Sequence, residues 1–134
     1  MSTFIVKLIV LILMIEMHII ADYKTPDCLQ NFKQQKWWKD NFPDKDWWKT
    51  EFIVGLGLHA FQWALFIMIP PVLYTLYTDP TKPGIISLPS IFILNILIHA
   101  YVDHLKANKG KLSLIEDQLM HFIQIITTWI LYMF

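Results

Sequence analysis

The chain has 134 residues, of which 55% are hydrophobic and 15% aromatic, and its mean hydropathy is +0.43. A soluble domain of this length is rarely so apolar, so the composition indicates a membrane protein with one compact domain. Eleven lysines balance eleven acidic residues, and this lack of net charge argues against nucleic-acid binding. Cys28 is the single cysteine, so no disulfide can form within the chain.

Four apolar stretches are each close to the ~20 residues that a helix needs to cross the hydrocarbon core of a bilayer. The first resembles a signal peptide, but no small-residue cleavage site follows it. Pro70 and Pro71 predict an end or a kink in the second stretch. Because the later connections are short, we expect an all-α fold, a single antiparallel bundle of four transmembrane helices. The predicted spans are residues 4–21, 51–77, 85–105 and 112–134.

The connection between the first two spans, residues 22–50, is polar and rich in tryptophan and lysine. Two similar sequences, KWWK at 36–39 and DWWK at 46–49, lie ten residues apart. Tryptophan rings and lysine ammonium groups suit the headgroup layer of a membrane, so we interpret this loop as an interfacial anchor. The alternative is a lid that admits lipid or phosphate substrates to a buried site. The loop is too acidic to favour single-stranded nucleic acid.

Lysines are distributed unevenly between the two ends of the predicted bundle. Nine of the eleven lie in the connections 22–50 and 106–111, whereas Lys7 and Lys82 belong to the opposite end. An excess of lysine marks the cytoplasmic side of a membrane protein. We therefore expect a multi-pass protein of the bacterial cytoplasmic (inner) membrane with both termini outside and the lipid bilayer as its partner.

Ionisable residues recur inside the predicted spans. Three pairs have i, i+4 or similar spacing, which places both members on one face of a helix. At ~1.5 Å per residue, the histidines of this set lie about 6–15 Å inside the cytoplasmic boundary. Ionisable groups in a membrane are costly and usually functional, and histidine with carboxylate is a ligand set for divalent metals. We therefore predict one buried centre formed by His18, Asp22, His59, His99, Asp103, Asp117 and His121.

Four further polar residues are assigned by their place relative to this centre. His104 lies about 140° around its helix from the shared face, so it is predicted to stay outside the centre. Gln118 follows a predicted ligand and is expected to orient it from outside the ligand set. Lys24 and Lys106 are predicted to lie at the mouth of the centre, where their charge would attract a phosphate.

The order and spacing of these residues also carry a resemblance to a family. The four-part pattern reads His18-x3-Asp22-aromatic, Leu58-His59, His99-x3-Asp103-x2-Lys106 and Asp117-Gln118-x2-His121. It resembles the domain-of-unknown-function family 3307, which consists of small integral membrane proteins of bacteria and phages. The resemblance covers nearly the whole chain, although Thr25-Pro26 stands where members usually carry Leu-Gln. It implies a bacterial or phage membrane protein and brings no established activity with it.

The leading functional hypothesis is a metal-dependent hydrolase that opens to the cytoplasmic leaflet. One or two divalent ions of the zinc or manganese/iron class would be bound by His18, His59, His99 and His121. The carboxylates that would bridge the ions or act as base are Asp22, Asp103 and Asp117. A metal-bound water with its pKa lowered to about 7 would attack a phosphorylated or lipid substrate.

The alternative hypothesis is a non-catalytic membrane protein. Its histidines and aspartates would then lock the bundle or line a path for protons or metal ions, in a homo-oligomer or in a phage protein that acts on the host. A path has to reach both sides of the membrane. The outer halves of the third and fourth spans are almost wholly apolar, which counts against a channel and favours a one-sided site.

Overall fold

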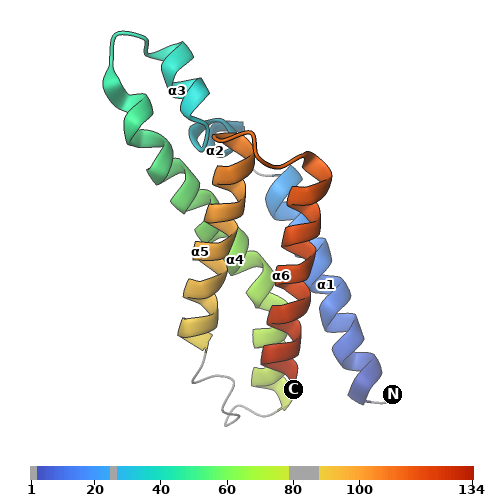
Figure 1. Ribbon diagram of the computed structural model, residues 1–134. Helices are drawn as coiled ribbons and strands as arrows, with labels where there is room; N and C mark the ends of the chain where they lie inside the picture. The colour runs from blue at the N-terminus through green and yellow to red at the C-terminus, as the bar shows by residue number, and fades with distance from the viewer. Residues whose placement is uncertain (1–2, 25–26, 79–87) are drawn as a thin grey trace.

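The computed structural model describes residues 3–24, 27–78 and 88–134, and these are all-α (Figure 1). Four long helices lie side by side in one bundle. Two short helices and a 3-10 turn follow the first long helix. This confirms the predicted all-α class, although the helical segments within the tryptophan-rich connection were not predicted. The elements in chain order are α1 (Thr3–Tyr23), α2 (Asp27–Phe32), α3 (Gln35–Asn41), η1 (Asp46–Lys49), α4 (Glu51–Thr78), α5 (Leu88–Ala107) and α6 (Leu114–Met133).

Three of the long helices, α1, α4 and α5, are long and apolar enough to cross a membrane. The fourth, α6, has 20 residues but a mixed composition. Its buried face combines polar side chains with apolar ones such as Ile125 and Trp129. Its exposed face carries large apolar side chains such as Ile115, Leu119 and Ile123. The predicted fourth span therefore stays a prediction. The polar residues on the buried face of α6 are Asp117, His121, Gln124 and Thr128.

The helix α4 runs through Pro70 and Pro71 instead of ending there, so the alternative of a helix end is wrong. Proline has no N–H to bond the carbonyl four residues earlier, so Pro70 and Pro71 leave the carbonyls of Phe66 and Ile67 without that partner. A transmembrane helix tolerates such a loss where neighbouring groups take over. The Thr75 hydroxyl donates a hydrogen bond of 3.0 Å to the carbonyl of Pro71 itself, in the following turn. The short connection at 78–84 between the second and third predicted spans, and the start of the third span, lie almost wholly outside the described residues.

The connection that precedes α4 folds over one end of the bundle (Figure 1). At Gly55, an added Cβ would lie 2.5 Å from the carbonyl carbon and oxygen of Phe32, so only glycine lets α2 approach α4 this closely. Gly57, by contrast, has open space around it. The Trp38 indole nitrogen donates a hydrogen bond of 2.8 Å to the Phe32 carbonyl. These contacts hold Lys33, the next residue, over the ends of α1 and α5.

The turn between α5 and α6 sets the register of two site-bearing helices. Gly110 has a φ of 60°, a left-handed conformation that glycine adopts at little cost. Ser113 and Glu116 then form a capping box in which each side chain bonds the other residue's backbone N–H. Because α6 begins at this cap, its first buried residues face the last turns of α5.

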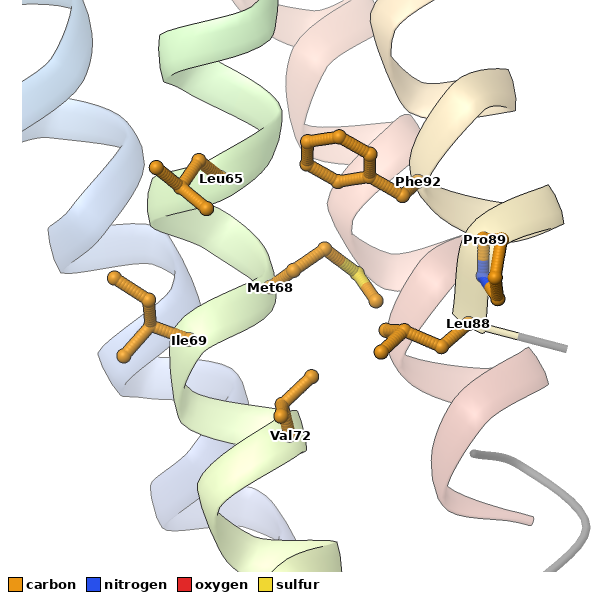
Figure 2. A pocket seen from close by; sticks show the side chains of 7 residues that line it. All are labelled: Leu65, Met68, Ile69, Val72, Leu88, Pro89 and Phe92. Carbon is orange, nitrogen blue, oxygen red and sulfur yellow. The ribbon is translucent and has the colours of Figure 1, made fainter. Parts of the chain in front are cut away.

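An open apolar groove of about 430 Å³ also lies between α4 and the start of α5. Figure 2 shows Met68 of α4 and Leu88 and Phe92 of α5 pointing into the space between the two helices. It lies well away from the predicted centre, since Leu88 and His99 are separated by eleven residues, or ~16 Å of helix. With no polar side chain, this groove offers no chemistry. Its lining residues are Leu65, Met68, Ile69, Val72, Leu88, Pro89 and Phe92.

Candidate metal centre

The four histidines predicted for the centre meet in the core of the bundle, one from each long helix. All four side chains are buried, with 0–1% of their surface exposed. The ring centroids of His99 and His121 are 4.3 Å apart, those of His59 and His99 5.2 Å, and those of His18 and His121 5.6 Å. The three predicted aspartates line the same place. Helices far apart in the sequence thus bring seven ionisable side chains into one cluster.

One set of ligand atoms within this cluster faces a common point. Asp22 Oδ1, His59 Nε2 and His99 Nε2 could hold a metal ion together. The aspartate oxygen lies 3.5 Å from the His59 nitrogen and 4.0 Å from the His99 nitrogen. Asp103 Oδ2 lies beside this set, at 3.3 Å from His59 Nε2 and 3.7 Å from His99 Nε2. A tetrahedral ion with bonds of 2.0–2.1 Å separates its ligands by about 3.4 Å, and these four nitrogen–oxygen distances of 3.3–4.0 Å are close to that spacing.

A second group overlaps the first. His99, Asp103 and His121 could also hold an ion. His121 Nε2 lies 3.4 Å from Asp103 Oδ1 and 3.4 Å from Asp117 Oδ1. Asp103 therefore turns one oxygen toward each group, and His99 belongs to both. We refer to the first set as the inner ligand set, and it consists of Asp22 Oδ1, His59 Nε2 and His99 Nε2 together with Asp103 Oδ2 beside them.

A hydrogen bond between His99 and His121 determines which of the two rings can bind an ion. The Nδ1 atoms of His99 and His121 are 3.2 Å apart. In neutral rings, one Nδ1 carries the proton and the other accepts it, so one of the two Nε2 atoms is free to bind an ion and the other carries a proton. While this bond persists, one ring can be a ligand and the other cannot. The arrangement favours a single ion.

Unpartnered polar atoms occur in both groups, and in or beside the second group they include His121 Nε2 and Asp117 Oδ1. Asp22 Oδ1, His59 Nε2 and His99 Nε2 are buried and have no hydrogen-bond partner among the described residues. Leaving a buried polar atom without a partner costs about 1–3 kcal/mol, so native proteins rarely do so. These three atoms belong to the inner ligand set, and a metal ion would satisfy all of them.

His18, a predicted ligand, is held differently. The Trp63 indole N–H donates a 2.8 Å hydrogen bond to His18 Nδ1, which must therefore be the accepting nitrogen. His18 Nε2 then carries the proton and donates to the Gln118 carbonyl oxygen at 3.1 Å. Both ring nitrogens are engaged, and His18 belongs to neither ligand group. In this structure the His18 ring is therefore engaged in hydrogen bonds to Trp63 and Gln118 instead of being a ligand.

Gln118 continues this chain of hydrogen bonds, as its predicted orienting role requires. Its amide nitrogen donates to Asp117 Oδ2 at 3.0 Å and to Asp22 Oδ2 at 3.4 Å. With Oδ2 of Asp22 held, Oδ1 is left to face the inner ligand set. Such outer partners fix ligand orientation in metal sites.

Trp63 is a site residue that the sequence analysis missed. It is fully buried, and its ring stacks on His99 with centroids 4.2 Å apart and planes 15° from parallel. The signal was present, because Trp63 follows His59 by four residues and so shares its face of α4. The indole fixes one histidine by hydrogen bonding and another by stacking.

The lysines at the mouth differ in part from the prediction. Lys106 Nζ lies 2.6 Å from Asp117 Oδ2, beside the centre as predicted. Lys33 Nζ, which was not singled out, lies 2.7 Å from Asp103 Oδ2 with 13% of its side chain exposed. Lys24 is exposed and does not line the polar pocket that opens beside the centre. His104 stays outside the centre as predicted and stacks on Phe52, with centroids 5.7 Å apart.

Comparison of the chain with known proteins gives no match to a family model, to a curated protein or to a solved structure. The resemblance to family 3307 therefore stays a prediction, and the functional argument depends on the geometry of the site.

Proposed function

We propose that this chain is a membrane protein whose four long helices all cross the bilayer and whose buried centre binds one divalent metal ion. The observation that carries the proposal is the set of buried, unpartnered atoms, Asp22 Oδ1, His59 Nε2 and His99 Nε2, which face Asp103 at ligand-to-ligand spacing. A purely structural network would be expected to pair its buried polar atoms. Nitrogen and oxygen ligands of this kind suit zinc, manganese or iron.

The surface of the bundle supports a crossing by all four helices. Each long helix exposes large apolar side chains, among them Ile12 at 64%, Leu73 at 61%, Leu97 at 62% and Ile115 at 73%. Apolar exposure on this scale is unusual for a soluble monomer and suits lipid. The last of these side chains is on α6, whose polar face is turned inward.

The polar residues farther along the bundle support a one-sided centre rather than a path. The Gln124 amide donates to the carbonyl and the side-chain oxygen of Asn95, at 2.9 Å each. The Thr128 hydroxyl donates to the same side-chain oxygen at 3.0 Å. These three residues mainly satisfy one another. Farther from the centre the buried side chains are mainly apolar, among them Val10, Met68 and Met133.

The chemistry that we propose for the centre is hydrolysis of a phosphorylated or lipid substrate. A divalent ion lowers the pKa of its bound water and stabilises negative charge on an oxygen. Asp22 and Asp103 are assigned as ligands, and Asp117 is the carboxylate left for proton transfer. Lys106 and the Gln118 amide hold Asp117 Oδ2, while Asp117 Oδ1 has no hydrogen-bond partner among the described residues.

Metal analysis of the purified protein tests the proposal. We expect about one zinc, manganese or iron ion per chain after purification in detergent without chelator. Unfolding should occur at a higher temperature with the ion than after its removal, because a ligand that binds only the folded state stabilises it. Protein that neither retains nor takes up an ion would contradict the proposal and favour the structural network.

The proposed orientation places the centre near the cytoplasmic face. In Figure 1 the start of α1 and the end of α6 lie at the end of the bundle opposite α2, α3 and the turn between α5 and α6. The end that carries α2, α3 and the turn between α5 and α6 is rich in lysine, so we assign it to the cytoplasm. A cysteine introduced at Lys109 in a Cys28→Ser background should react with an impermeant reagent only after the cells are opened. Labelling of intact cells would reverse the assignment.

A further inference from the structure

A polar pocket opens beside the candidate centre. Its volume is about 340 Å³, and it lies between the ends of α1 and α5, the start of α6 and the segment just after α2. A smaller hollow of about 220 Å³ adjoins it and shares Gln30, Lys33, Asp103 and Lys106 with its lining. The remaining residues that line the larger pocket are Asp22, Tyr23, Leu114 and Gln118.

Two ammonium groups face this pocket from different elements. Lys33 follows α2 and is paired with Asp103, and Lys106 lies in the last turn of α5 and is paired with Asp117. Lysine in a partly buried site is a common binder of phosphate, because its hydrogen bonds to an anion are charge-assisted. Only 13% of the Lys33 side chain and 35% of the Lys106 side chain are exposed, so both charges are poorly screened by solvent.

The charge of the site depends on the ion. With neutral histidines, the three aspartates of the centre outweigh these two lysines by one negative charge. An anion in the pocket is then repelled. A bound divalent ion reverses the balance to one positive charge and becomes the largest local charge. The pocket and the ion are neighbours, since Asp22 and Asp103 both line the pocket and belong to the inner ligand set.

We propose that this pocket binds a phosphate group and that it does so only when the divalent ion is in place. The inference rests on the proposed ion site and names the substrate class of that site. An ion on Asp103 Oδ2 takes over the oxygen that Lys33 now contacts at 2.7 Å, which frees the ammonium group for the anion. Lys33 and Lys106 then hold the phosphate from one side while the ion meets it from the other.

The depth of the pocket admits two sources of phosphate. Tyr23 is the last residue of α1 and Leu114 is the first of α6, so the pocket lies where the long helices end. In the proposed orientation this is the level of the lipid headgroups. A phospholipid headgroup and a free phosphorylated molecule would both reach it, and the phosphate group is their shared chemistry.

The test measures inorganic phosphate binding by calorimetry, with ion-loaded protein and with protein stripped by a chelator. We expect binding to weaken by about tenfold or more on stripping, the usual scale of coupling between two sites. Lys33→Met and Lys106→Met should each weaken phosphate binding to the loaded protein by at least about tenfold. Their ion content should not fall, because losing a lysine makes the site more negative. Lys111→Met, an exposed lysine at the same end, is the matched control.

A second arm separates the two sources. The loaded protein is placed in phosphatidylcholine vesicles with or without phosphatidic acid. If phosphatidic acid weakens the binding of inorganic phosphate, the site takes a lipid headgroup, and if it does not, the site takes a free phosphate; both results support the site. Equal phosphate binding with and without the ion, or an equal loss in the Lys111 control, would overturn the inference while leaving the ion site standing. Absence of any bound ion would overturn both, and the metal analysis identifies that case.

Discussion

Replacing His99 with alanine is expected to abolish divalent-ion binding, whereas replacing His104 with alanine should leave it unchanged. His99 is fully buried and belongs to both groups of residues that could hold an ion, so its loss removes either possible site. The expected loss of affinity exceeds the 10–100-fold that typically follows removal of an outer partner of a metal ligand. His104 is one turn farther along the same helix, stacked on Phe52 and outside the centre.

The measurement is the metal content of each purified variant together with its helical circular dichroism. His59→Ala provides a second ligand deletion on another helix, for the case that the His99 variant does not fold. His59 Nε2 has no hydrogen-bond partner among the described residues, so its removal breaks no hydrogen bond there. Equal metal content in the His99, His59 and His104 variants would mean that the ligands are wrongly assigned.

The sequence predicted the helical fold because apolar length is a strong signal in α1, α4 and α5. The i, i+4 pairs were also readable. His18 and Asp22 share a face of α1, and His99 and Asp103 share a face of α5, because the helical period leaves no other arrangement. Predicting that these pairs meet in space required one further assumption, that short connections make neighbouring helices antiparallel. For α5 and α6, the turn at Gly110 and the cap at Ser113 form this short connection.

The choice among the seven residues could not be predicted, because it depends on which atom faces which. The Trp63 indole occupies one nitrogen of His18, and Gln118 occupies the other. Both are hydrogen bonds across helices, set by side-chain rotamers rather than by spacing. Sequence periodicity predicts which face of a helix a histidine lies on, but it does not predict the hydrogen-bond partners of its two ring nitrogens.

Lys33 shows a second limit. It belongs to a connection that reads as an interfacial loop, and nothing in its neighbours marks it as part of a buried site. Its position depends on α2 lying against α4, a contact that requires the missing side chain at Gly55. Docking of a short helix onto a long one is a tertiary event that local propensity does not encode. Lys24, nearer in sequence to Asp22, was the more obvious candidate and is exposed instead.

Replacing His121 with phenylalanine is expected to weaken ion binding by about 10–100-fold without changing the stoichiometry of one ion per chain. When His99 Nε2 binds the ion, His99 Nδ1 carries the proton and donates it to His121 Nδ1, 3.2 Å away. His121 Nε2 then carries a proton and lies between Asp103 Oδ1 and Asp117 Oδ1, each at 3.4 Å. His121 thus acts as the outer partner that fixes the His99 ring. Phenylalanine keeps an aromatic ring, a slightly larger one, at this position and removes this support.

The opposite assignment makes a different prediction. If His121 were the ligand and His99 its partner, the phenylalanine variant would lose the ion entirely and His59→Ala would retain it, because His59 belongs only to the inner ligand set. A centre with two ions would need both Nε2 atoms free, and two N–H groups would then face each other across 3.2 Å. His104→Phe is the matched control, since it makes the same chemical change outside the centre. Affinities from chelator competition for the three variants distinguish the assignments, and two ions per wild-type chain would exclude the single-ion arrangement.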